Sequence, residues 1–146
     1  MVYTVGEAAK QIKVAASTLR YYDKEGLLPF VERSDGGIRL FKAKDMATLK
    51  TIECLKKTGM PIKEIKHFID CCVEGDAKID ERLAIITDQQ ASVIAHMQEL
   101  QDMLDMLDFK RWYYETAQSA GSCSIHDDLP IEAVPEKFHK YVHEPR

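Results

Sequence analysis

The fold is decided by residues 4–26, which read TVGEAAKQIKVAASTLRYYDKEG. At the start of this stretch, Thr4 and Glu7 have the spacing of a capping box. The Thr4 hydroxyl can accept a hydrogen bond from the backbone N–H of Glu7, and the Glu7 carboxylate can reach back to the Thr4 N–H. This pattern predicts a short helix that begins after Thr4 and ends near Ile12.

A second short helix is predicted over 15–24. Lys13 and Val14 form the turn before it, and Gly26 stops it because glycine readily adopts the left-handed conformation that ends helices. Two short helices joined by a tight turn indicate a helix-turn-helix.

Extended segments and two more helices follow. Short strands are expected over 30–33 and 38–42, with the hairpin-turn sequence SDGG at 34–37 between them. This hairpin would be the wing of a winged helix-turn-helix. Helices are then expected over 45–58 and over 61–72, the second opened by a proline at its first position.

The longest predicted element is a helix over 78–120, which contains no proline or glycine. At about 1.5 Å per residue it would be about 60 Å long. Its apolar residues recur at alternating spacings of four and three, which predicts a coiled-coil seam that a partner helix must cover. The seam residues expected to dimerise are Leu83, Ile86, Val93, Met97, Leu100, Leu104 and Leu107.

The chain is therefore expected to be mainly α-helical, with three parts. These are a winged helix-turn-helix domain over 1–75, a dimerisation helix over 76–120 and a tail over 121–146. The tail contains three prolines and little periodicity, so it is expected to be irregular.

The composition is ordinary for a globular protein. Hydrophobic residues make up 45% and charged residues 30%. No apolar run approaches the roughly 18 residues that cross a bilayer, and no signal peptide is visible. We therefore expect a cytoplasmic location, no membrane contact, and thiols rather than disulfides at the four cysteines.

Charge is divided unevenly along the chain. Residues 1–75 hold 13 lysines and arginines against 10 acidic residues, a balance of +3, whereas 76–146 hold 7 against 14, a balance of −7; together they give the net −4. A local basic surface in the first part suits a sequence-specific nucleic-acid binder.

The first 75 residues resemble the mercury-resistance-regulator (MerR) family of bacterial transcription factors. The resemblance rests on the order and spacing of Val5-Gly6-Glu7-Ala8-Ala9, Ser17-Thr18-Leu19-Arg20-Tyr21-Tyr22-Asp23, Gly26-Leu27-Leu28-Pro29, Arg33, Gly37-Ile38-Arg39-Leu40-Phe41, Asp45 and Gly59-Met60. Three departures are visible: the second helix begins Val14-Ala15-Ala16 where a Ser or Thr cap is usual, Lys13 stands where Gly is common, and Phe41 stands where Tyr is common.

The resemblance implies a homodimer joined through an antiparallel coiled coil and bound to double-stranded promoter DNA. In the family, the dimer distorts a promoter whose spacer is too long for RNA polymerase, which is control by deformation. The second helix would enter the major groove and the wing would bind phosphates. One of Tyr21 and Tyr22 must face inward. The expected DNA-binding residues are Ser17, Thr18, Arg20, Tyr21, Tyr22, Lys24, Arg33, Gly37, Arg39 and Lys42.

The resemblance is nearest to the aldehyde- and thiol-stress-responsive subgroup, in which one cysteine at the position of Cys54 is the proposed sensor of electrophiles. Lys50 and Lys57 would favour its reactive thiolate, and Glu53 would oppose it. A packing role for Cys54, without sensing, is an equally good interpretation, because Cys54 is expected to share a helix face with small residues.

Other chemistry has weaker support. Cys123, His126, His139 and His143 have zinc-finger-like spacing, but a solvated tail without metal is preferred, and no cofactor is expected. No Gly-rich loop or nucleophile elbow is present, so no catalytic residues are expected and an enzyme is disfavoured. Two alternatives stay open: a regulator of the same family that senses a metal or other ligand through its C-terminal region, and a DNA binder without an effector.

Overall fold

The computed structural model describes residues 1–142, and His143 of the tail pattern lies outside them. Two compact units are present, one spanning Met1–Val93 and a second beginning at Ile94. The boundary between the two units falls within the long helix, whereas the sequence predicted boundaries between the three parts of the chain after residues 75 and 120. The first turns of that helix pack with the N-terminal elements, and its last turns pack with the tail. Each unit is described by itself.

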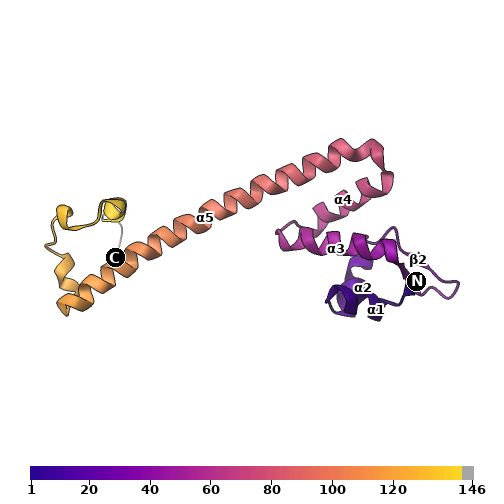
Figure 1. Cartoon of the computed structure of the whole chain (residues 1–146), viewed down its shortest axis with the longest axis horizontal. Helices are drawn as coiled ribbons and strands as arrows, with labels where there is room; N and C mark the ends of the chain where they lie inside the picture. Colours follow the sequence, from indigo (N-terminus) through magenta and orange to yellow (C-terminus); the bar gives the residue numbers. More distant parts are fainter. Residues whose placement is uncertain (143–146) are drawn as a thin grey trace. The chain divides into compact units, whose positions relative to one another are not determined.

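The first unit opens with the expected pair of helices, α1 (Val5–Ile12) and α2 (Ala16–Lys24) (Figure 1). The capping box is confirmed: the Glu7 N–H donates to Thr4 Oγ1 at 3.2 Å, and the Thr4 N–H donates to Glu7 Oε2 at 2.8 Å. Lys13 ends α1 in the left-handed region, at φ 61°. Lys13 therefore adopts the backbone conformation that a glycine would adopt more easily.

A three-stranded sheet forms the wing, in the order β1-β3-β2. The strands β2 (Glu32–Arg33) and β3 (Arg39–Lys42) pair antiparallel across the expected turn, in which Gly37 has φ 79°. The sequence missed β1 (Val2–Tyr3), which pairs antiparallel with β3. Two residues are too few to show the alternation by which strands are recognised.

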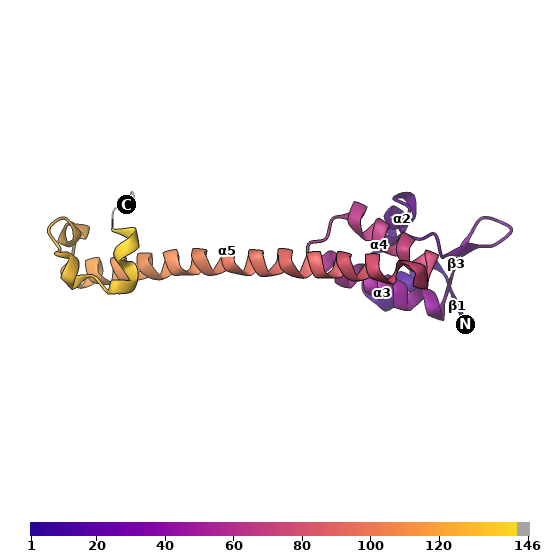
Figure 2. The ribbon, with the colours of Figure 1, turned by 90° about the horizontal axis from the view of Figure 1, so that it is seen from above.

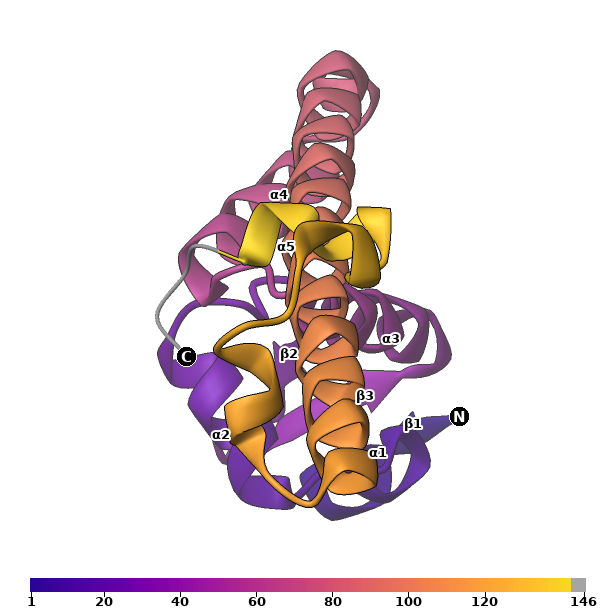
Figure 3. The ribbon, with the colours of Figure 1, turned by 90° about the vertical axis from the view of Figure 1, so that its left-hand side faces the viewer.

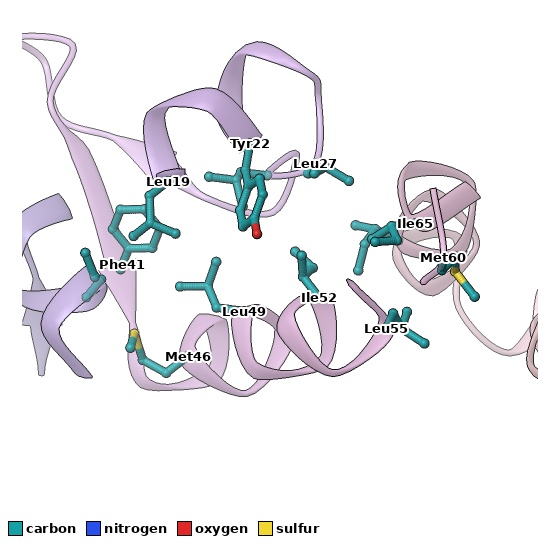
Figure 4. Packing of buried hydrophobic residues seen from close by; sticks show 14 residues of the cluster. Leu19, Tyr22, Leu27, Phe41, Met46, Leu49, Ile52, Leu55, Met60 and Ile65 are labelled. Atoms are coloured by element: carbon teal, nitrogen blue, oxygen red, sulfur yellow. The ribbon is translucent and has the colours of Figure 1, made fainter. Parts of the chain in front are cut away.

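Two further helices, α3 (Ala43–Lys57) and α4 (Ile62–Glu74), complete the core of the first unit. Figure 4 shows core side chains from α2, β3, α3 and α4 converging on one another. The largest fully buried side chains in this cluster are Leu19, Tyr22, Leu27, Phe41, Leu49, Ile52, Ile65 and Ile69. Phe41 belongs to the core and makes no solvent contact, so a phosphate contact from its side chain is not available.

The short 3-10 helix η1 (Asp76–Lys78) leads into α5 (Ile79–Ala120), which has 42 residues. Figure 2 shows α5 as one uninterrupted helix. Within the first unit, Ile85 of α5 packs against the core cluster. Among the described residues, no helix has the combination of length and apolarity that crossing a bilayer would need.

The tail in the second unit differs from the irregular segment that the sequence predicted. It forms three 3-10 helices, η2 (Cys123–His126), η3 (Ile131–Ala133) and η4 (Glu136–Tyr141), which lie around the end of α5 in Figure 3. Val134, Phe138 and Tyr141 pack on Phe109 of α5. Each of these 3-10 helices is too short to show a helical period in its sequence. The buried aromatic rings nevertheless supply enough apolar area to hold the helices in place.

Candidate nucleic-acid interface

The helix α2 presents one polar face to solvent and one apolar face to the core. Ser17, Arg20, Tyr21 and Lys24 are exposed, and Thr18 is half-buried at the start of the helix. Arg20 and Lys24 form no ion pair with any described residue. Both cations are therefore free to bind phosphate.

Tyr22 corrects the sequence prediction, because it is fully buried and not a surface residue. Its ring points from α2 toward α3 (Figure 4). Its hydroxyl donates to Glu53 Oε1 at 2.5 Å and accepts from Lys56 Nζ at 3.1 Å. Burial, together with the neighbouring Glu53 carboxylate, raises the pKa of Tyr22 well above its usual value. Tyr22 thus joins the predicted DNA-reading helix to α3, while Tyr21, 48% exposed, stays at the surface.

The wing is tied to α2 by Asp23. This carboxylate forms ion pairs with Arg33, at 2.8 Å, and with Arg39. The hydrogen bond from Arg39 keeps the pKa of Asp23 below its usual value, and the charges of both arginines act in the same direction. The wing and α2 are therefore held as one surface, with Arg33 half exposed and Arg39 mostly covered.

The rest of the wing carries mixed charge. Lys42 Nζ pairs with Glu32 Oε1 at 2.8 Å, and this contact lowers the pKa of Glu32. Gly37 lies exposed in the turn, where its carbonyl accepts from Arg33 Nη1 at 3.2 Å. Lys10 and Lys13, which were not among the predicted DNA-binding residues, are both exposed, and Lys13 lies in the turn between α1 and α2.

Cys54 lies exposed on α3. Its neighbour Glu53 is turned toward Tyr22, and the small side chains expected to pack with Cys54, Ala47 and Thr51, are themselves exposed. Within this chain, Cys54 is therefore not a core residue. The other thiols differ: Cys71 is buried, Cys72 half-buried and Cys123 exposed.

The predicted seam on α5 lies at the surface of the single chain. Leu83 and Met97 are each 63% exposed and Leu104 59%, whereas Val93 is half-buried. Such a row of large apolar side chains is unusual on a monomer. The other exposed members are Ile86, Leu100 and Leu107.

Two histidines of the tail pattern, His126 and His139, contact backbone carbonyls. His126 Nε2 donates to the Tyr113 carbonyl at 2.8 Å, and its ring stacks on that of Tyr113. His139 Nε2 donates to the Val134 carbonyl at 2.8 Å. Cys123 is exposed, and the described tail residues yield no group that could hold an ion.

Comparison with protein families gives two matches. Residues 3–71 match the model described as MerR HTH family regulatory protein, and residues 46–108 match the model described as MerR, DNA binding. Together they cover the helix-turn-helix, the wing and more than half of α5.

Similar proteins agree with the family models. An uncharacterized HTH-type transcriptional regulator of Haemophilus influenzae is 45% identical over 136 residues, which is 93% of this chain and 98% of the relative. The Bacillus subtilis regulator AdhR is 33% identical over 90 residues, 62% of this chain and 64% of AdhR. These relatives are transcription regulators and not enzymes.

Solved structures extend the likeness to the fold. HiNmlR, a MerR family regulator lacking the sensor domain and solved bound to promoter DNA, is 44% identical, with a TM-score of 0.69 over 85% of this chain and 98% of its own. A regulator from Bacillus thuringiensis is 43% identical, with a TM-score of 0.65 over 75% of this chain and 96% of its own.

Proposed function

Because this chain belongs to the MerR family of transcription regulators, which bind promoter DNA, we propose that it acts as a homodimer that controls one promoter by distorting its DNA. The observation that carries this proposal is the surface formed by α2 and the wing, which Asp23 holds together. A helix in the major groove and a wing on the backbone would contact DNA from one rigid face. On this surface, Arg20 and Lys24 are positively charged side chains that form no ion pair with any described residue.

The exposed seam of α5 supports the homodimer. Leu83, Met97 and Leu104 face solvent in the single chain, and covering the exposed part of each such side chain contributes about 1–2 kcal/mol. A second copy offers a matching apolar row, and an antiparallel arrangement would place two DNA-binding units on one pseudo-palindromic site. RNA polymerase would then act on the distorted promoter.

We further propose that Cys54 senses electrophiles such as aldehydes. The exposed Cys54 thiol would lose its proton to solvent, and the thiolate would attack the carbonyl carbon, forming a C–S bond as the C=O π bond breaks. The resulting alkoxide would take a proton back from solvent, so that the product is a hemithioacetal and no other reactant is consumed. Glu53, the adjacent residue, accepts the hydrogen bond from Tyr22, so a change at Cys54 would act on the contact between α3 and α2.

The test of DNA binding uses the purified full-length protein and labelled DNA from upstream of its own gene. Binding should exceed that to a shuffled sequence of equal length and should weaken steeply with salt. Arg20→Ala should weaken binding to both DNAs and reduce the salt slope by about 1, as expected for one lost phosphate contact. Lys137→Ala, which removes an exposed charge from the tail, is the control and should leave the slope unchanged. Equal affinity of the wild type for both DNAs would count against a sequence-specific regulator.

A further inference from the structure

Three side chains outside the DNA-binding surface converge at the junction of α4 and α5. His67 Nε2 lies 2.8 Å from Glu81 Oε1 and 3.9 Å from Cys71 Sγ. The nitrogen, sulfur and carboxylate oxygen all lie within 4.8 Å of one another. One nitrogen, one sulfur and one oxygen donor thus lie close together within the first unit.

Local structure accounts for the convergence. His67 and Cys71 are four residues apart, so they share one face of α4. Gly75, at φ 86°, and the following 3-10 helix reverse the chain and bring Glu81 of α5 back to that face. Arg82 Nη2 fixes the reversal by donating to the Gly75 carbonyl at 2.9 Å.

Cys71 is the least accessible of the three. Its side chain is 98% buried, and its only hydrogen-bond neighbour among the described residues is His67. Burial raises the pKa of the Cys71 thiol, and the Glu81 carboxylate acts in the same direction.

We propose that His67, Cys71 and Glu81 bind a divalent cation of the zinc class. Imidazole nitrogen, thiolate sulfur and carboxylate oxygen are the donors that zinc takes. With bonds of about 2.0–2.3 Å, tetrahedral ligand atoms lie roughly 3.3–3.8 Å apart, so small side-chain rotations suffice. Water would fill the fourth position.

The charges balance in this site. The thiolate and the carboxylate together neutralise the +2 of the ion, and the Cys71 proton passes to solvent on binding. Lys78 contacts the other Glu81 oxygen, Oε2, at 3.1 Å, so it can remain in place while Oε1 ligates the ion. The bound ion would tie the last turns of α4 to the first turns of α5.

The test is a cobalt titration of the full-length protein after chelator treatment and dialysis. Co²⁺ on a cysteine thiolate produces a charge-transfer absorption, and the site predicts that this absorption saturates at one ion per chain and disappears when Zn²⁺ is added. Cys71→Ser should abolish it. His67→Gln and Glu81→Gln, both at accessible positions, should weaken Co²⁺ binding at least tenfold.

Controls separate this site from the other thiols. Cys72→Ser, Cys54→Ser and Cys123→Ser should each keep the absorption and the affinity of the wild type. No thiolate absorption in the wild type, or absorption that survives Cys71→Ser, would overturn the proposal. If Cys71→Ser does not fold, unchanged affinity in both His67→Gln and Glu81→Gln would overturn it equally.

Discussion

The Tyr22 hydroxyl on α2 donates a 2.5 Å hydrogen bond to the Glu53 carboxylate on α3. This contact joins the helix proposed to read DNA to the helix that carries Cys54, and Glu53 and Cys54 are adjacent in sequence. Lys56, one turn further on α3, donates to the same hydroxyl at 3.1 Å. The position of α2 thus depends on polar contacts that lie next to the proposed sensor.

Replacing Tyr22 by Phe should destabilise the protein by about 1–3 kcal/mol, because a hydrogen bond to a charged group is lost while the ring stays buried. Urea denaturation of the full-length protein measures the change. Tyr21→Phe is the matched control, since Tyr21 lies at the surface, and it should shift stability by less than about 0.5 kcal/mol. If both substitutions changed the free energy of unfolding equally, the hydrogen bond from Tyr22 to Glu53 would not contribute to stability.

The ion pairs of Asp23 make stability depend on pH in the acid range. Because the pKa of Asp23 is lowered in the folded state from its ordinary value of 3.8, its contribution is fully present above about that pH and is lost as pH falls through the folded-state pKa. Asp23→Asn should cost about 1–3 kcal/mol at neutral pH.

The difference between wild type and Asp23→Asn should narrow as the pH falls below that range. Chemical denaturation at neutral pH and at several acid pH values measures it. A difference that stays constant down to the most acidic point would show that Asp23 is not ion-paired with Arg33 and Arg39 in solution.

The start of α2 lacks a side-chain cap, as the sequence predicted, because Ala15 stands at the N-cap position. Its backbone is extended, at φ −72° and ψ 147°, which suits a capping serine. Ala15→Ser should therefore stabilise the protein by about 0.5–2 kcal/mol. Ala47→Ser, at an exposed position inside α3, should instead destabilise it slightly. The unfolding temperatures of the two variants, measured by thermal unfolding, decide whether the N-cap accounts for the gain in stability.

The seam on α5 predicts the oligomeric state. Leu104→Glu places a charge in the proposed interface and should raise the dimer dissociation constant at least tenfold, as measured by analytical ultracentrifugation. Ala95→Glu, on the opposite face of the same helix, is the control and should leave the dimer intact. A Leu104→Glu protein that stays dimeric would place the interface elsewhere.

Most helices and strands between residues 5 and 120 were predictable because each has a local signal. The capping box, the Gly37 turn and the apolar seam of α5 are of this kind. Tyr22 was ambiguous because two adjacent tyrosines on a short helix suit both faces equally, and only Glu53, 31 residues away, decides between them.

Features built from long-range contacts left no such signal. The order of the tail depends on Phe138 and Tyr141 meeting Phe109, and those residues show no common period. His67, Cys71 and Glu81 come together only because the chain reverses between α4 and α5. The spacing of these three residues in the sequence therefore does not indicate that their side chains meet.

The most direct test of the proposed function measures promoter output in cells carrying the wild type, Cys54→Ser or Cys123→Ser, before and after exposure to formaldehyde. The reporter is the region upstream of the protein's own gene, and DNA binding of all three proteins is checked in parallel. Cys123 is the matched control because it is also an exposed thiol. If Cys54 is the sensor, wild type and Cys123→Ser respond to formaldehyde, while Cys54→Ser binds DNA but does not respond. An equal response from all three proteins would contradict a sensing role for Cys54.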